Sequence, residues 1–249
     1  PIARPTFDVP LAEEKTAQVR AALKSAGFEL SGPDALVMNS DDVADAITML
    51  SEDPPALLLL LQSSFADSTM ALQIAQSIDR PLLMWALPEE RVGGRLRLNS
   101  FCGINLAGHG LTRAGYRYDY IYADPDDAAA LDKVRTLHTA AEVRLKLQGS
   151  RVGRVGENPA GFDTCLVDAE GLRQRMGLEV VQVDLQEVFA KARVAQPEAV
   201  AAARERVQAA LSGMDEMDQK STDGTLSTYV TLREIADHES SMNGAPYID

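Results

Sequence analysis

The sequence predicts an α/β protein made of two domains, each an open sheet of parallel strands covered by helices. Short apolar segments alternate with amphipathic ones along all 249 residues, and the links between them are short. Residues 56–61 form an uninterrupted apolar run, which is typical of a parallel strand buried on both faces. The strand–helix pattern starts again at Arg151, after Gly149-Ser150. We therefore expect one domain at residues 1–149 and a second at residues 150–249.

The first domain is expected to contain five short strands. They lie at residues 2–7, 28–30, 56–61, 81–86 and 118–122. Helical periodicity predicts helices between them at residues 11–26, 40–50, 70–78 and 100–114, and a long helix from residue 124 to 149. Pro10 suits a first helical turn and Gly27 a helix end. Ser40 and the pair Asp67-Ser68 are expected to cap the helices that follow them.

The second domain repeats the pattern with fewer apolar residues. Strands are predicted at residues 151–155 and 179–183, with a helix at 168–176 between them. Residues 190–212 are expected to be mostly helical with a break at Pro197, and residues 225–239 form a last helix. Residues 215–223 are polar and predict a loop, and residues 245–249 look like the beginning of another strand.

Composition excludes several classes of function. The chain carries 24 Lys and Arg against 37 Asp and Glu, a net charge of −13 that is spread evenly over both halves. Binding to nucleic acid or to an anionic membrane is therefore not expected. The six-residue apolar run at 56–61 is far shorter than the ~18 residues of a membrane span. Two cysteines, no CxxC spacing and no secretion leader favour a cytoplasmic protein.

Familiar motifs of catalysis are mostly missing from the sequence. Gly156 and Gly161 have the spacing of a phosphate loop, but Phe162-Asp163 stands where Lys-Ser/Thr is required, so nucleotide binding is rejected. The three histidines form no zinc motif. Cys102 and Cys165 are interpreted as buried, inert thiols because no Cys–His motif accompanies them.

Five side chains are candidates for a ligand cleft at the carboxyl edge of the first sheet, where ligands of α/β proteins bind. Arg4 interrupts an apolar strand, so it must either pair with a carboxylate such as Asp8 or line a cleft. Trp85 ends a strand and is either a core residue or a platform for stacking a sugar ring. The run from Cys102 to Gly110 is unusually small and polar for a core helix. The predicted substrate-binding residues are Arg4, Trp85, Ser100, Asn105 and His109.

Four segments, in order, resemble the metal-dependent sugar isomerases of the L-fucose/L-arabinose isomerase superfamily. The first is the opening IARPTFD at residues 2–8, and the second runs from Pro81 to Gly103 and ends in LNSFCG. The third begins with RVGRVG at residues 151–156. The fourth contains MGLEV at 176–180 and VDLQEV at 183–188. The chain looks closest to the shorter, fucose-isomerase-like branch.

The resemblance implies two flavodoxin-like or Rossmann-like domains followed by a catalytic domain. It also implies aldose–ketose interconversion through an ene-diol, helped by Mn²⁺ or a similar divalent ion, and a homo-oligomer in which the first domain covers a neighbour's active site. The chain departs from the family because it stops at Asp249 and lacks the metal-binding motifs. We therefore expect a small-molecule sugar as partner, but neither catalysis nor bound metal for this chain alone. The alternative is a stand-alone sugar-binding or regulatory module without catalysis.

Overall fold

The computed structural model describes residues 1–90, 93–243 and 247–248, and the chain divides into two compact units. Unit 1 comprises Pro1–Leu145 and unit 2 comprises Lys146–Asp249. Both are mixed α/β structures in which parallel strands form small sheets. The division lies close to the boundary predicted at Gly149-Ser150. Within the described part of the chain, no helix combines the length and the hydropathy that a membrane crossing needs.

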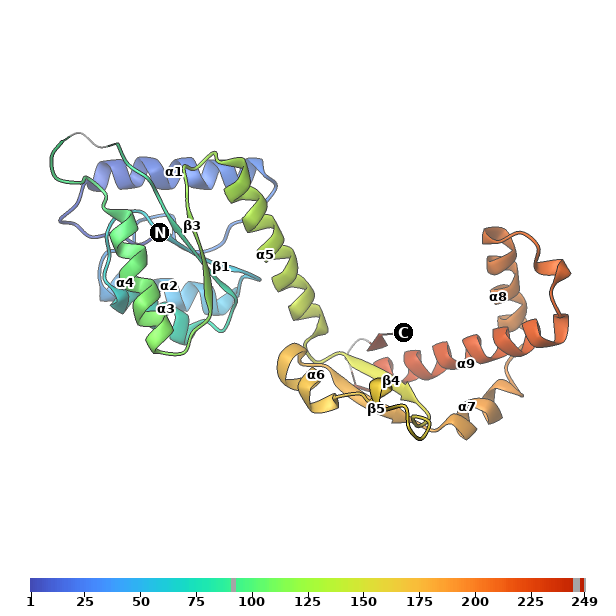
Figure 1. The fold of residues 1–249 in the computed structure, drawn as a ribbon. Coiled ribbons are helices and arrows are strands. Elements are labelled where there is room, and N and C mark those ends of the chain that lie inside the picture. Colours follow the sequence, from blue (N-terminus) through green and yellow to red (C-terminus); the bar gives the residue numbers. More distant parts are fainter. Residues whose placement is uncertain (91–92, 244–246, 249) are drawn as a thin grey trace. The chain divides into compact units, whose positions relative to one another are not determined.

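Unit 1 contains a three-stranded parallel sheet in the order β1-β2-β3 (Figure 1). Its strands are β1 (Leu58–Gln62), β2 (Leu82–Ala86) and β3 (Tyr118–Tyr122). Its helices are α1 (Val9–Ser25), α2 (Ser40–Glu52), α3 (Ser68–Ser77), α4 (Ser100–Arg113) and α5 (Ala128–Leu147), the last of which ends in unit 2. These elements correspond to the helices and to three of the five strands predicted for this domain.

The other two predicted strands are corrected by the structure. Residues 2–7 contribute only Ile2, which bridges Val37 and Gln62 in parallel before the chain turns at Pro5. Pro5 has no N–H with which to continue a ladder. Residues 28–30 form no strand, because Phe28 and Leu30 pack against the core cluster around Leu83 and Trp85 instead. The residue that pairs with Ile2 on this side is Val37 and not a residue of 28–30.

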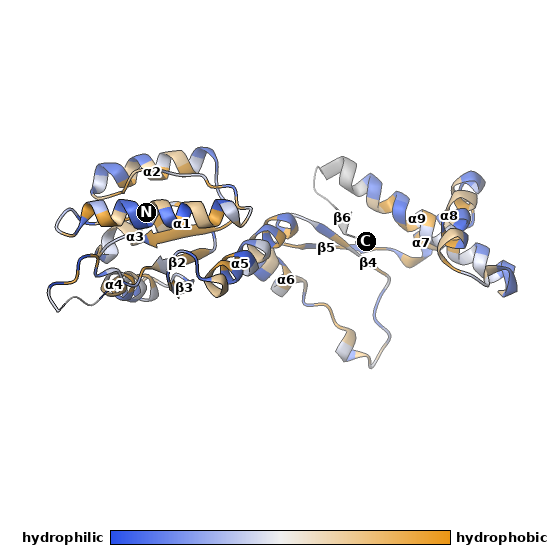
Figure 2. Ribbon diagram, turned by 90° about the horizontal axis from the view of Figure 1, so that it is seen from above, coloured by the Kyte–Doolittle hydropathy of each residue, from blue (hydrophilic) through white to orange (hydrophobic). Residues whose placement is uncertain are grey.

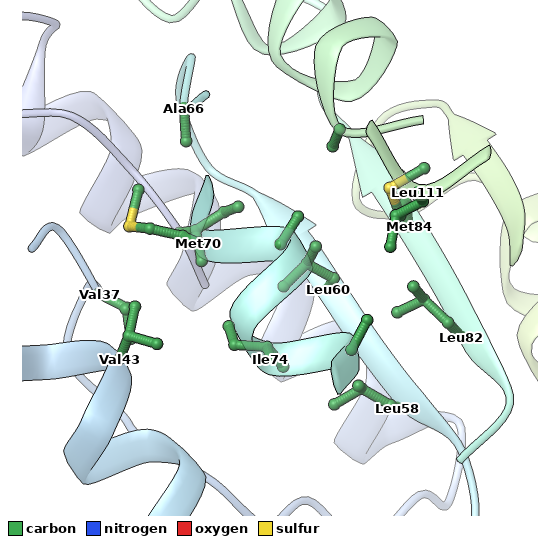
Figure 3. Packing of buried hydrophobic residues seen from close by; sticks show 14 of the residues in the cluster. Val37, Val43, Leu58, Leu60, Ala66, Met70, Ile74, Leu82, Met84 and Leu111 are labelled. Atoms are coloured by element: carbon green, nitrogen blue, oxygen red, sulfur yellow. The ribbon is translucent and has the colours of Figure 1, made fainter. Parts of the chain in front are cut away.

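Alternate residues of the strands build two hydrophobic layers, one on each side of the sheet. Leu58 and Leu60 pack with α2, α3 and α4, where Met70 and Ile74 of α3 reach between them and Val43 (Figure 3). Leu59, Leu61 and Trp85 face the opposite layer with α1 and α5. Because both faces of β1 and β2 are covered, these two strands need no polar side, which explains their apolar sequence. In β3 only Ile121 is buried, and its sequence YDYIY is more polar.

Unit 2 contains a second parallel sheet, in the order β5-β4-β6. Its strands are β4 (Arg151–Val155), β5 (Glu179–Val183) and β6 (Tyr247–Ile248), and its helices are α6 (Ala169–Met176), α7 (Leu185–Ala192), α8 (Pro197–Ala210) and α9 (Gln219–Asn243). The break at Pro197 is confirmed. The helix predicted from residue 225 begins earlier, at Gln219, because Asp218 accepts hydrogen bonds from the backbone and hydroxyl of Ser221. Hydrophilic and hydrophobic stretches alternate along its helices (Figure 2).

Candidate functional site

Three loops follow the carboxyl ends of neighbouring parallel segments in unit 1, and hydrogen bonds hold them together. They are residues 3–8, residues 63–67 and the described parts of 87–99, and we call them the carboxyl-edge loops. The backbone N–H of Phe65 donates to the carbonyl of Leu98 at 2.7 Å, and that of Asp8 donates to the carbonyl of Arg97 at 3.0 Å. Such an edge is where ligands bind in open α/β sheets.

Arg4 lies on the first of these loops, in an ion pair with Asp67 on the second. The predicted pairing of Arg4 with a carboxylate is thus confirmed, but its partner is Asp67, because Asp8 pairs with Arg97. Both paired side chains remain about 40% exposed, so the guanidinium is partly open to a ligand. Its Nε atom is shielded from solvent and makes no hydrogen bond to any described residue. The pair therefore orients Arg4 and leaves one of its donors unused.

The third loop is held in place by two carboxylates. Asp8 accepts from Arg97 Nε at 2.8 Å and from the backbone of Leu11 at 3.1 Å. The Leu11 hydrogen bond and then the Arg97 guanidinium lower the pKa of Asp8 below its usual range. Glu89 accepts from the backbone N–H groups of Arg97, Leu98 and Asn99 at 2.6–2.8 Å. Residues 97–99 are thereby fixed across the edge of the sheet.

Trp85 and Ser100 are structural residues in this arrangement. Trp85 is fully buried, and its indole N–H donates to the carbonyl of Ala123 at 3.0 Å. The expectation of a sugar-stacking platform is thus corrected, because neither face of the ring reaches the surface. The hydroxyl of Ser100 accepts from the backbone of Leu87 at 3.0 Å and donates to the carbonyl of Gln62. Ser100 therefore joins the ends of β1 and β2 to the start of α4.

Asn105 and His109 lie on the exposed face of α4, and no hydrogen bond or ion pair within the described residues joins either of them to Arg4. At a rise of about 1.5 Å per residue, His109 is roughly 13 Å along the helix from Ser100. Asn105 donates to the carbonyl of Phe101 at 3.0 Å, within its own helix. Their neighbours on the surface include Phe101, whose ring packs on Tyr122 with 4.8 Å between centroids. The structure does not gather the five predicted residues in one cleft.

The small residues of α4 are explained by close packing. A Cβ at Gly103 would come within 2.8 Å of Oε1 of buried Gln62, and one at Gly108 within 2.6 Å of the hydroxyl of Tyr118. A Cβ at Gly110 would meet the Cβ of Ser68 at 2.7 Å, where α3 crosses α4. The glycines let the helix approach its neighbours, so the unusual composition of this run is a property of the core.

Several residues at this edge were not among the sequence candidates. Besides Asp67 and Glu89, they include Arg95, whose Nη2 donates to the carbonyl of Thr6 at 3.2 Å. The Arg95 guanidinium also lies over the ring of Phe7, 5.2 Å from its centroid, and Phe7 packs on Phe65 at 5.4 Å. The available signal for Asp67 and Glu89 was their position shortly after the apolar strands β1 and β2, and no sequence signal pointed to Arg95.

The metal implied by the family resemblance has no fitting ligands in the described residues. Across residues 1–90, 93–243 and 247–248, no three His, Cys, Asp or Glu side chains lie close enough to hold an ion. Divalent-ion chemistry needs several such donors converging on one point. Among the carboxylates of the carboxyl-edge loops, Asp67, Asp8 and Glu89 are already engaged by Arg4, Arg97 and backbone N–H groups. The described residues therefore offer no set of ligands that fits a divalent ion.

Comparison with known proteins gives one family and several relatives. Residues 1–148 match the family model described as the N-terminal domain of fucose/sulfoquinovose isomerase. A sulfoquinovose isomerase of Alkalicoccus urumqiensis is 31% identical over 196 residues, which are 78% of this chain and 43% of that protein. Another, from Clostridium sp. strain MSTE9, is 27% identical over 98% of this chain and 54% of its own length. The chain thus spans about half the length of the curated relatives it matches.

Proposed function

Because the chain belongs to the fucose/sulfoquinovose isomerase family, we propose that it is the amino-terminal part of an aldose–ketose isomerase and that its carboxyl-edge loops help to bind the sugar. The family match over residues 1–148 carries this proposal, because it covers the whole of unit 1. The relatives named sulfoquinovose isomerase support an isomerase that acts on a sulfonated aldose.

Arg4 is the proposed contact to the sugar. An aldose presents a row of hydroxyl and carbonyl oxygens, and a guanidinium offers five N–H donors in a fixed plane. Asp67 holds this plane at the edge of the sheet, and the exposed part of the guanidinium is open to a ligand, whereas the Nε atom is shielded from solvent. Such a contact binds and orients the sugar. It moves no proton, since an arginine stays protonated at any physiological pH.

We assign the remaining chemistry to the complete protein. The carboxylate that moves the proton of the ene-diol step and the ligands of a divalent ion such as Mn²⁺ are proposed to lie outside the described residues. The 249-residue chain alone is then inactive. The two units are proposed to be flavodoxin-like; the parallel bridges of Ile2 to Val37 and Gln62 support this for unit 1. We further propose a cytoplasmic homo-oligomer, in keeping with the family resemblance and the two free cysteines.

A panel of aldoses tests the proposal. The protein is produced from its complete gene and assayed with Mn²⁺ for conversion of sulfoquinovose, fucose and arabinose to their ketoses, beside the 249-residue chain. We expect turnover of at least one sugar by the complete protein and none by the chain alone. Binding without turnover by the complete gene product would favour the stand-alone sugar-binding module. Turnover by the 249-residue chain would show that the catalytic groups lie within it.

Two arginine variants test the role of Arg4. Arg4→Ala is expected to lower kcat/KM about tenfold or more, because a charge-assisted hydrogen bond contributes roughly 1.5–3 kcal/mol. Folding should persist, since an exposed ion pair contributes only about 0–1 kcal/mol. The control is Arg80→Ala at the opposite edge of the same sheet, where Arg80 donates to the carbonyls of Pro55 and Asp79. Equal kinetics in the two variants would refute a sugar contact at Arg4.

A further inference from the structure

The charged groups of the carboxyl-edge loops are paired unequally. Arg4 is neutralised by Asp67 and Arg97 by Asp8. Glu89 is occupied by three backbone N–H groups. Glu90 and Arg95 differ, because neither forms an ion pair with a described residue. Arg95 is therefore an exposed cation that can take an anionic ligand at the edge of the sheet where the sugar is proposed to bind.

Arg95 is exposed, and two contacts hold it in one orientation. Its Nη2 donates to the carbonyl of Thr6, and its plane lies over Phe7, which rests on Phe65. Thr6 and Phe7 belong to the turn that directly follows Arg4, so the two guanidiniums approach the same edge from neighbouring loops. One of the five donors of Arg95 is engaged by Thr6, and the remaining ones are available to a ligand.

A sulfonate fits this arrangement. A guanidinium held in plane binds an anion with several oxygens through two parallel hydrogen bonds, which is stronger and more directional than a single contact. The family description names two sugars, and they differ at the last carbon. Fucose has an uncharged methyl group there, whereas sulfoquinovose carries a sulfonate. An unpaired arginine gains a partner from the second sugar and nothing from the first.

We propose that Arg95 binds the sulfonate of the substrate and thereby selects a sulfonated aldose over its uncharged counterpart. This inference rests on the proposed function, since it assumes that the sugar binds at the carboxyl-edge loops. The competing explanation is that Arg95 only anchors residues 93–99 to the turn at Thr6 and Phe7. That role would affect every sugar equally, whereas recognition of a sulfonate affects only the charged one.

The test compares two sugars that differ only in the sulfonate, sulfoquinovose and 6-deoxyglucose. Dissociation constants of both are measured by calorimetry for the protein from the complete gene and for Arg95→Met, which keeps an unbranched apolar stem. The wild-type protein is expected to bind sulfoquinovose more tightly. Arg95→Met should weaken its binding of sulfoquinovose about 10- to 100-fold and leave its binding of 6-deoxyglucose unchanged. The control, Arg117→Met, changes an exposed arginine that precedes β3 and should alter neither.

Each other outcome overturns the inference. A wild-type protein that does not prefer the sulfonated sugar, or that binds neither sugar, shows that Arg95 recognises no sulfonate. Equal losses for both sugars in Arg95→Met support the anchoring role instead. Turnover is measured separately on the same samples. Binding selectivity without isomerisation would defeat the proposed function but preserve the sulfonate contact, so the two failures are distinguishable.

Discussion

The two units follow the same strand–helix pattern, yet β1 and β2 of unit 1 are buried and β4 and β5 of unit 2 are not. All five residues of β2 and four of the five in β1 are buried, whereas β4 and β5 contain no buried residue. Large apolar side chains of unit 2 stay at the surface, among them Phe162, Leu166 and Leu211. A common order of strands and helices therefore does not produce a common core.

The cause is visible in the strands themselves. The sequences LLLLQ and LLMWA place apolar side chains on both faces of unit 1, and helices cover both. The sequences RVGRV and EVVQV of unit 2 place charged and polar groups among the valines. Because burial of apolar area is the main favourable contribution to folding, unit 1 should be the more stable of the two.

Hydrogen exchange should show the largest difference between the units. Amides protected by a buried core exchange only through extensive unfolding, while thinly packed elements open locally. We expect the amides of β1 and β2 to exchange roughly a hundredfold more slowly than those of β4 and β5, which corresponds to about 2.7 kcal/mol. Mass spectrometry on the 249-residue chain measures both sets at once. Similar protection in the two sheets would contradict the comparison.

Two leucine truncations give the next largest effect. Leu83 of β2 is fully buried, and Leu178, next to β5, is the counterpart in unit 2 at 7% exposure. Leu83→Ala should lower the free energy of unfolding of unit 1 by about 2–5 kcal/mol, and Leu178→Ala should cost unit 2 less. Trp85 is the only tryptophan and is buried in unit 1, so its fluorescence reports unfolding of that unit. Urea titration followed at Trp85 should therefore detect Leu83→Ala and not Leu178→Ala. A larger effect of Leu178→Ala on this signal would contradict the claim that unit 1 has the better packed core.

A pair of glycines provides a third test, with opposite signs. A Cβ at Gly110 would press on the Cβ of Ser68, which cannot rotate away, so Gly110→Ala should destabilise unit 1 by about 1–3 kcal/mol. Gly224 lies in α9 of unit 2 with nothing within 4 Å of an added Cβ. Gly224→Ala should stabilise that helix by about 0.5–1 kcal/mol. Thermal unfolding of the two variants measures both. A higher thermal midpoint for Gly110→Ala, as for Gly224→Ala, would mean that the packing of α4 on α3 is looser than described.

The sequence predicted most of the helices and the parallel strands because these depend on local periodicity and caps. It failed at residues 28–30, where Phe28 and Leu30 are apolar for packing and not for strand pairing. The small run in α4 was interpreted as a possible pocket, but its cause is the approach of Tyr118 and Ser68, which periodicity along one helix does not reveal.

The site was less predictable than the fold for a related reason. Arg4 was identified because a charged residue interrupted apolar sequence. Its partner Asp67 is 63 positions away along the chain and looks like an ordinary helix cap, a role it also fills. Arg95 is an exposed arginine in a polar loop and stands out only once Thr6 and Phe7 are seen beneath it. Pairings across distant loops depend on tertiary structure, so one sequence does not predict them.

Acidification should give the smallest effect and compare one carboxylate from each unit. The pKa of Asp8 is lowered by the backbone of Leu11 and by Arg97, and that of Glu170 by Arg173 and Gln174. A carboxyl whose pKa is lower in the folded state stabilises the protein above its unfolded pKa, about 3.9 for Asp and 4.3 for Glu, and loses that contribution as the pH falls through the lowered value. At pH 7, Asp8→Asn should therefore lower the thermal midpoint, and the difference from wild type should shrink below about pH 4.

Glu170→Gln serves as the matched variant for unit 2. Glu170 pairs with Arg173 inside one helix turn, whereas Asp8 joins Arg97 across 89 positions of sequence. Loss of Glu170 affects only α6, so its effect on the midpoint should be smaller and should fade over a similar range of pH. Protonation of Asp8 also weakens its contact to Arg97, so the protection of the Asp8 amide, which donates to the carbonyl of Arg97, should fall below about pH 4 once the intrinsic pH dependence of exchange is removed. An Asp8→Asn deficit that stays constant or grows on acidification would show that Asp8 does not stabilise unit 1 through its charge.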